Sequence, residues 1–231
     1  MAASLALQSL EERLIDWGWL RENFGEDIVP AVIGHLYLSF VSIAIALVIS
    51  IPAGVLVARH RKAYAPVTFF TGFLYTIPSL ALFAILVTVP GIGIGPRPVI
   101  IALVAYSLLV LIRNTVAGLD SVPAETKDAA RGMGLTDRQI LLRVELPLAL
   151  PVIVAGIRIA TVTVIGIATI GAYIAGGGLG ALIFDGINRN FPTMVIAGAA
   201  LATAMAVLAD ISLLWLERRL RPWARQGRRR V

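Results

Sequence analysis

The chain has 231 residues, of which 58% are hydrophobic and 15% are charged, and its mean hydropathy is +0.86. A soluble domain has about 45–50% apolar and about 25% charged residues, so this composition excludes an ordinary water-soluble protein and indicates a membrane protein. The formal net charge is +6 and there is no cysteine, which excludes disulfides, thiolate metal sites and cysteine nucleophiles. The basic residues gather at the ends of apolar runs, which is typical of topology signals and argues against nucleic-acid binding.

Residues 1–35 are predicted to form an extracytoplasmic segment of the mature protein. They lack the positively charged stretch, compact apolar run and small-residue cleavage site of a signal peptide. Leu7, Leu10, Leu14 and Trp17 recur at helical spacing, with acidic residues between them. This pattern favours a helix lying on the membrane surface, and a tail without fixed structure is the alternative.

Five apolar runs make up a predicted transmembrane region, 36–216, which a basic tail, 217–231, follows. A helix that crosses a membrane needs roughly 20 apolar residues. The predicted spans, in chain order, are 36–58, 66–89, 99–112, 148–175 and 193–216. The fold class is therefore predicted to be an all-α integral membrane protein with five transmembrane helices.

The distribution of Lys and Arg predicts the orientation of these spans. Segments 59–62, 113–147 and 217–231 hold 15 of the 20 basic residues, whereas residues 1–35 hold two basic and six acidic residues. By the positive-inside rule the N-terminus lies outside and the C-terminus lies in the cytoplasm, which requires an odd number of spans. The basic tail is expected to anchor the last helix at anionic lipid head groups, and nucleic-acid binding is the weaker alternative.

Polar residues interrupt the second predicted span at Tyr75, Thr76, Pro78 and Ser79. Because proline has no backbone N–H, it frees a carbonyl that can face a water-filled cavity. These four residues are therefore candidates for lining a path through the membrane. The alternative is a packed kink whose hydroxyls bond within their own helix.

The segment 113–147, on the cytoplasmic side, is longer than a connection requires and carries helix signals. Pro123 near a first helical position, with acidic Asp128 in the following turns, predicts the start of a short helix. Gly134 predicts the end of that helix, because glycine adopts the left-handed conformation of a helix cap. The small residues at Ala129 and Ala130 would let a groove of another protein close tightly around this helix.

A second short helix is predicted to follow at once. Thr136 with Gln139 three residues later is a capping box, and Pro147 is expected to stop the helix. Two short helices hinged at a glycine are suited to transmitting force from a docked partner. The alternative is an amphipathic loop packed on the membrane face.

Two charged residues, Arg158 and Asp210, fall inside predicted spans at similar depths from the cytoplasmic side. Charges inside a membrane are costly and usually find partners. The hypothesis is that these residues pair, within one subunit or across a dimer, near a cytoplasmic gate. The alternative is that Arg158 reaches the head groups along its own aliphatic stem.

The stretch DAARGMGLTDRQILLRVELPLALP resembles the EAA signature of binding-protein-dependent ABC transporter permeases. That signature is Glu-Ala-Ala, three residues, Gly, nine residues, then Ile-x-Leu-Pro. Two conservative departures occur, Asp128 in place of Glu and Val144 in place of Ile. The residues that match the signature positions, the conservative Asp128 included, are Asp128, Ala129, Ala130, Gly134, Leu146 and Pro147.

The resemblance implies the permease of a type I ABC importer, with a MetI-like fold, in the cell inner membrane. It implies alternating access, driven by coupling helices at 113–147 that dock on a separate ABC ATPase, expected in two copies. ATP and Mg would bind that ATPase, because no GxxxxGK[ST] stretch is present and the GGGLG at 176–180 lacks the Lys. An extracytoplasmic solute-binding protein and a second permease, either a copy or a paralogue, would complete the transporter within the lipid bilayer.

Four stretches resemble the osmoprotectant branch of these importers, for glycine betaine, choline, carnitine or proline: TIPSLAL at 76–82, LIRNT at 111–115, ARGMGLTDRQILLRVELPLALPVIVAGIR at 130–158 and AGGGLGALIFDGI at 175–187. A permease for methionine or another small polar solute is the alternative within the family. A passive channel and a membrane enzyme are the alternatives of a different class. The enzyme is disfavoured because no cluster of His, Asp or Glu has metal-binding or acid–base spacing, so no catalytic or metal site is expected.

Overall fold

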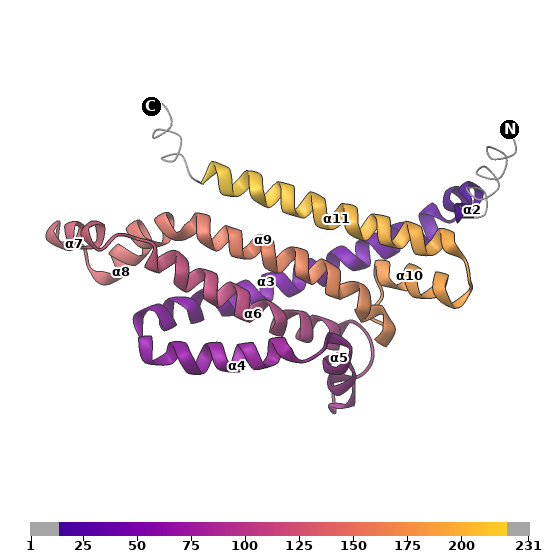
Figure 1. The fold of residues 1–231 in the computed structure, drawn as a ribbon, viewed down its shortest axis with the longest axis horizontal. Coiled ribbons are helices and arrows are strands. Elements are labelled where there is room, and N and C mark those ends of the chain that lie inside the picture. Colours follow the sequence, from indigo (N-terminus) through magenta and orange to yellow (C-terminus); the bar gives the residue numbers. More distant parts are fainter. Residues whose placement is uncertain (1–13, 221–231) are drawn as a thin grey trace, which may run out of the picture. The chain divides into compact units, whose positions relative to one another are not determined.

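The computed structural model describes residues 14–220, and every regular element in that range is helical (Figure 1). Within these residues, four long helices have the length and hydropathy needed to cross a membrane, and two shorter helices pass the same test only as a broken pair. The long helices are α3 (Val29–Arg59), α6 (Pro96–Asp120), α9 (Leu146–Gly171) and α11 (Pro192–Arg219). The broken pair is α4 (Tyr64–Thr76) and α5 (Ser79–Thr88). The structure therefore supports four membrane spans, or five if the broken pair is one span.

The described chain divides into two compact units, each assembled from three segments. The first unit contains Pro78–Leu103 and Val164–Val207 together with the described chain up to Ser42. The second contains Ile43–Ile77 and Val104–Thr163 together with the described chain from Leu208. Long helices run through both units. Each unit has its own apolar core residues.

The core of the first unit forms around α10 (Leu179–Asn188) and the start of α11. Its buried residues are Ile28, Leu179, Leu182, Met194 and Ala202. Trp19 of α2 (Trp17–Glu22) packs edge-on against Phe191, with ring centroids 5.4 Å apart. Asp16 caps the N-terminus of α2, since its carboxylate accepts from the Trp19 N–H at 2.9 Å.

A buried histidine links three helices of this unit. His35 on α3 has no exposed surface, and its Nε2 donates to the Ile165 carbonyl of α9 at 3.0 Å. Its Nδ1 accepts from the Leu179 N–H at the start of α10 at 3.3 Å. An imidazole ring with one donor and one acceptor is neutral, so His35 satisfies two backbone groups without burying a charge.

The second unit has two small apolar cores that share α6. One contains Val57, Ile112 and Val116, and the other contains Leu119, Ala149 and Ile153. In the most apolar 18-residue stretch of α6, 61% is buried, whereas in that of α11 only 17% is buried. The more enclosed helix, α6, is therefore a packing scaffold, whereas α11 leaves most of its apolar surface to lipid or to another protein.

α10 was not among the predicted elements, because its residues lie in the predicted loop between the last two spans. Its ten residues are too few to cross a membrane, so a search for runs of roughly 20 apolar residues does not find it. Gly180 lets α10 approach α9 closely, since a Cβ there would lie 1.9 Å from the Thr169 carbonyl oxygen. The connection is thus a packed helix.

Two predicted helix ends are wrong. α6 continues past Arg113 to Asp120, because an exposed charge marks the edge of an apolar stretch without breaking a helix. The expected stop at Pro147 does not occur, and Pro147 lies in the first turn of α9. The chain is helical from Asp137 to Ile174 and passes through a π-helical stretch, η3 (Leu141–Glu145). The π-helical stretch interrupts the regular hydrogen-bond ladder directly before Pro147, so the helix runs on although proline has no backbone N–H.

The predicted surface helix at the N-terminus is described only in part. Leu7 and Leu10 lie outside the described residues. Leu14 and Trp17 are both exposed, but non-helical residues separate them and Trp17 begins α2. The two therefore do not share one continuous helix.

Candidate functional site

The segment between α6 and α9 folds into two short helices, α7 (Ala124–Gly132) and α8 (Asp137–Ile140), next to each other (Figure 1). We call α7, α8 and η3 the two-helix element. Gly134 has a φ of +84°, the left-handed conformation expected of a residue that ends a helix. The predicted capping box is present, since Thr136 and Gln139 each bond the other's backbone N–H. Both helices of the predicted hinge are therefore present, with the glycine between them.

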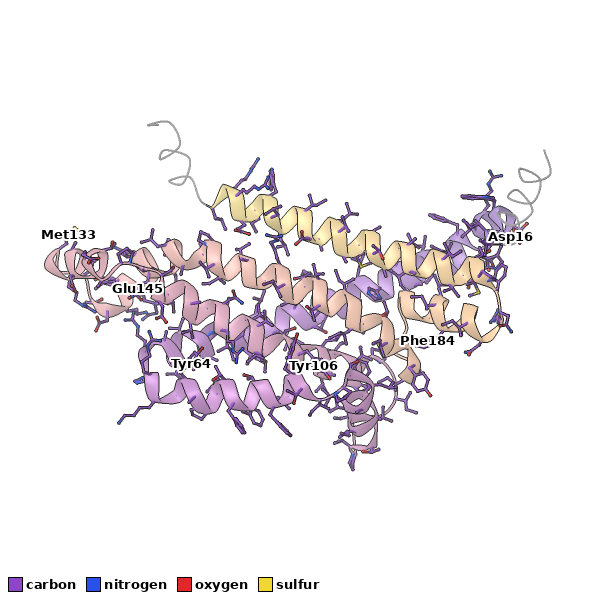
Figure 2. All side chains as sticks on the ribbon, in the orientation of Figure 1. Asp16, Tyr64, Tyr106, Met133, Glu145 and Phe184 are labelled. Atoms are coloured by element: carbon purple, nitrogen blue, oxygen red, sulfur yellow. The ribbon has the colours of Figure 1, made fainter. Side chains whose placement is uncertain are left out.

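A buried carboxylate holds the two-helix element to the rest of its unit (Figure 2). The Glu145 side chain is 4% exposed, and its Oε2 accepts from Arg59 Nη2 at 2.6 Å. Its other oxygen, Oε1, lies 3.6 Å from Lys127 Nζ. Lys127 also donates to the Leu119 carbonyl at 3.2 Å. One carboxylate thus joins η3 to the last residue of α3 and to α7.

A second ion pair lies near this junction, at the surface. Arg61, just after α3, bonds Asp120, the last residue of α6, through both carboxylate oxygens. The Asp120 carboxylate raises the pKa of the Arg61 guanidinium. The two side chains are 61% and 40% exposed. Water and salt therefore screen this pair, unlike the pair at Glu145.

The exposed face of α7 differs in part from the predicted docking surface. Asp128 and Ala129 are exposed, and Met133 at the tip of the element is 73% exposed (Figure 2). Ala130 is only 1% exposed and packs inward, so the predicted surface of two adjacent alanines is wrong for Ala130. A helix turns by about 100° per residue, which takes Ala130 from the exposed side of α7, where Asp128 and Ala129 lie, to its packed side. Arg131 pairs with Asp128 at 2.8 Å and keeps that carboxylate in place.

The remaining signature residues lie at the start of α9. Leu146 is half-buried and packs on the core cluster of Leu119, Ala149 and Ile153. Pro147 is exposed. The structure therefore places the signature in one continuous stretch, from the exposed face of α7, through the buried Glu145, to the first turn of α9.

The predicted path residues surround the break between α4 and α5. Ile77 and Pro78 have extended backbones, which end one helix and begin the next. The Leu74 carbonyl accepts from the Ile77 N–H at 3.3 Å, and the Tyr106 hydroxyl donates to the Ile77 carbonyl at 2.6 Å. The kink therefore satisfies these two carbonyls within the protein.

The side chains at this break have mixed environments. Tyr75 is 41% exposed and lies edge-on to Tyr106, with ring centroids 6.1 Å apart. Thr76 is exposed, and its hydroxyl donates to the Phe73 carbonyl of its own helix at 2.7 Å. Pro78 is exposed and Ser79 is half-buried. Tyr75 is the one of the four that offers an exposed aromatic ring, whereas Thr76 fits the alternative of a packed kink.

The two charges that were predicted to lie inside the membrane are next to each other, and a third joins them. Arg158 donates to Asp210 Oδ1 through Nε at 3.0 Å and through Nη2 at 2.8 Å. It also donates to Glu217 Oε2 through Nη1 at 3.0 Å. The Arg158 side chain is 24% exposed, and these bonds pair it within this chain, so it does not need to reach the head groups. Glu217 was not predicted as a partner.

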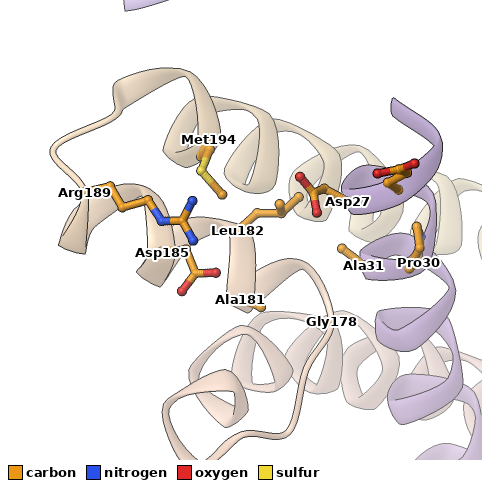
Figure 3. A pocket seen from close by; sticks show the side chains of 10 residues that line it. Asp27, Pro30, Ala31, Gly178, Ala181, Leu182, Asp185, Arg189 and Met194 are labelled. Atoms are coloured by element: carbon orange, nitrogen blue, oxygen red, sulfur yellow. The ribbon is translucent and has the colours of Figure 1, made fainter. Parts of the chain in front are cut away.

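A pocket of about 330 Å³ opens in the first unit, between the start of α3 and α10. Figure 3 shows Asp185 and Arg189 on the α10 side and Asp27 with Ala31 on the α3 side. The carboxylates of Asp27 and Asp185 are exposed. The pocket is therefore a polar recess that water reaches.

Glu145, Glu217 and His35 are buried ionisable residues whose contacts sequence reasoning missed. The sequence held a signal for each: an ionisable residue lies in or beside an apolar run, where it needs a partner. Glu145 lies in the signature stretch, in RVELP, directly before Leu146. Its partner Arg59 is 86 residues away in the chain, so only the fold shows why the carboxylate is there.

Comparison with protein families matches residues 50–222 to the family of binding-protein-dependent transport system inner membrane components. The match covers well over half of the chain. This chain belongs to that family. It is thus a multi-pass protein of the cell membrane, and the predicted family is confirmed.

Named relatives cover most of the chain. It is 38% identical over 213 residues to the glycine betaine/carnitine/choline transport system permease protein OpuCB of Bacillus subtilis (strain 168), covering 92% of this chain and 97% of that protein. It is 43% identical over 189 residues to the osmoprotectant import permease protein OsmW of Salmonella typhimurium, covering 80% of this chain and 86% of that protein. Both names denote permeases that transport osmoprotectants or the solutes glycine betaine, carnitine and choline.

Solved structures share the fold. A chain of the MetNI methionine ABC transporter in an inward-facing conformation matches with a TM-score of 0.75 and 25% identity, covering 84% of this chain and 95% of that chain. A chain of an amino acid ABC transporter crystallised with histidines matches with a TM-score of 0.70 at 18% identity, over 89% of this chain and 99% of that one. The predicted MetI-like fold is therefore confirmed at the level of fold.

Proposed function

We propose that this chain is the permease subunit of an ABC importer for glycine betaine or a related osmoprotectant such as choline, carnitine or proline. The solute crosses the membrane by alternating access, and a separate ATPase subunit supplies the energy. The two-helix element carries this proposal: it presents Asp128 and Ala129 outward on α7, a helix that the buried Glu145 carboxylate joins to the end of α3. A docked partner that moves this face moves a rigid element, whereas a floppy loop would absorb the motion.

The solute class is supported by the relatives. Permeases named for glycine betaine, carnitine and choline are 37% to 44% identical to this chain, against 25% for the methionine transporter. An osmoprotectant is therefore better supported than methionine, the alternative within the family. The exposed Tyr75 ring at the break between α4 and α5 suits a trimethylammonium group, which binds to aromatic faces.

The proposed transporter contains further subunits. Two ATPases dock on the two-helix elements of two permeases, of which the second is either a copy or a paralogue, and ATP and Mg bind the ATPases. A solute-binding protein delivers the solute from outside. With five spans and the N-terminus outside, the polar recess at Asp27 and Asp185 faces that binding protein.

Transport by the reconstituted protein tests the proposal. The chain is placed in proteoliposomes with its ATPase and binding protein, and uptake of labelled glycine betaine is followed with and without ATP. We expect uptake only with ATP. We also expect Gly134→Trp to lose it with membrane insertion intact, because Trp strains the left-handed turn and occupies the docking face.

A matched control separates docking from strain. Gly91 also has a positive φ, +87°, and as at Gly134 no atom lies within 4 Å of the place that an added Cβ would take, but Gly91 lies between α5 and α6. Gly91→Trp is expected to keep ATP-driven uptake. ATP-driven uptake of methionine without betaine uptake would keep the class and discard the osmoprotectant. Uptake that is equally fast without ATP would indicate a passive channel.

A further inference from the structure

The two-helix element is joined by the chain to α6 and to α9, but not to α3. α3 ends at Arg59, and 64 residues of chain separate Arg59 from the start of α7. The ion network at Glu145 supplies the missing connection, with one carboxylate oxygen on Arg59 at 2.6 Å and the other 3.6 Å from Lys127. Glu145 therefore bridges the end of α3 and α7.

Burial makes this bridge stiff. The Glu145 side chain is 4% exposed, so water screens its attraction to Arg59 and Lys127 far less than it screens a surface pair. Separating Glu145 from its partners would leave a buried charge uncompensated, at a high cost in free energy. Arg59, Glu145 and Lys127 therefore stay together when the two-helix element moves. The pair of Arg61 and Asp120 is nearby but exposed, so its attraction is weak and it is expected to pass on little movement.

The two partners of Glu145 lie at the exposed face of α7, where a docked protein would push, and at the end of α3, which would be moved. Lys127 directly precedes Asp128, whose side chain lies on the exposed face of α7. Arg59 is the last residue of α3, a helix of 31 residues. A displacement of the α7 face therefore reaches a long membrane helix through one carboxylate.

We propose that Glu145 is a positioning residue that passes the movement of α7 to the cytoplasmic end of α3. Closure of the partner ATPase then moves α3 together with α6 and α9, which are attached by the chain. This inference rests on the proposed function, because it requires an ATPase that moves α7.

The number of solute molecules imported per ATP hydrolysed tests this role, since a residue with only a structural role would not change that ratio. Arg59→Gln is the first variant, because the Arg59 side chain is 36% exposed and its loss leaves Glu145 beside Lys127. We expect the ratio to fall at least fivefold in Arg59→Gln and in Glu145→Gln, while the ATPase still copurifies. The double variant should be no worse than the lower single variant, because both remove the same link. Arg61→Gln is the matched control and should stay within twofold of the native ratio.

The outcomes are distinct. An unchanged ratio in both Arg59→Gln and Glu145→Gln, with native coupling intact, overturns this role and leaves the proposed function standing. Loss of ATPase copurification together with uptake in Arg59→Gln shows a purely structural junction and also overturns it. Native uptake that does not require ATP defeats the proposed function itself, and that result is obtained before any variant is measured.

Discussion

Arg158 shows how a charge inside an apolar helix is accommodated in this fold. Its planar guanidinium has donors in a fixed fork, so it bonds two carboxylates at once, Asp210 and Glu217. Those two residues are seven apart on α11, about two helical turns, and therefore lie on one face. Neither carboxylate alone would use all three donor nitrogens that Arg158 offers here.

Removal of the cation is expected to cost more than removal of one anion. Arg158→Gln leaves two neighbouring carboxylates without their cation and should destabilise the protein by about 2 kcal/mol, a fall in Tm of roughly 5 °C. Asp210→Asn keeps Glu217 as a partner, and Asp210 is 38% exposed, so about 1 kcal/mol is expected. Thermal unfolding of the purified protein in detergent measures both.

Arg138→Gln is the control for this pair of variants, because Arg138 is exposed on α8 and its substitution should change stability by less than about 0.5 kcal/mol. A Tm for Arg158→Gln equal to that of the control would mean that the cluster contributes nothing to stability. If Asp210→Asn also leaves assembly and transport unchanged, the cluster has no role near a cytoplasmic gate.

At the scale of elements, the hinge between α7 and α8 depends on one backbone conformation. Gly134 has a φ of +84° and no atom lies within 4 Å of an added Cβ, so a side chain there causes strain without a clash. We expect Gly134→Ala to destabilise the protein by about 1–2 kcal/mol, the usual cost of this conformation for an L-residue. Gly132→Ala, in equally open space but at the helical end of α7, should be neutral or stabilising. Tm values of the two purified variants decide this, and equal values would contradict the predicted strain.

Elements set by local rules could be predicted from the sequence. The capping box at Thr136 and the glycine that ends α7 depend on neighbouring residues alone, and both are present. Long apolar runs placed the spanning helices, because hydropathy depends on composition. The signature stretch was visible for the same reason, as a local pattern of residue types.

Features that no local residue pattern specifies could not be predicted. The passage of the helix through Pro147 depends on the π-helical stretch before it, which no local pattern revealed. Ala130 faces inward because α7 packs on one side, a direction that the sequence of a short helix leaves open. The junction at Glu145 joins residues 86 positions apart, so only the fold brings them together.

For the whole molecule, the number of spans depends on the broken pair α4 and α5. If the pair crosses the membrane, three spans separate Glu26 from Arg138 and these residues lie on opposite sides. If the pair enters and returns on one side, two spans separate them and they lie on the same side. The excess of Lys and Arg on 59–62, 113–147 and 217–231 favours the five-span arrangement, because it puts all three segments on the cytoplasmic side.

Cysteine labelling in intact cells distinguishes these arrangements without background, because the chain has no cysteine of its own. Glu26 and Arg138 are both exposed, so a thiol at either position is open to reagent. We expect a membrane-impermeant maleimide to label Glu26→Cys in intact cells and Arg138→Cys only after permeabilisation. Labelling of both in intact cells would mean that α4 and α5 form a re-entrant pair, and the two-helix element would then face away from a cytoplasmic ATPase. The same experiment therefore tests the span count and the location that the coupling role of the two-helix element requires.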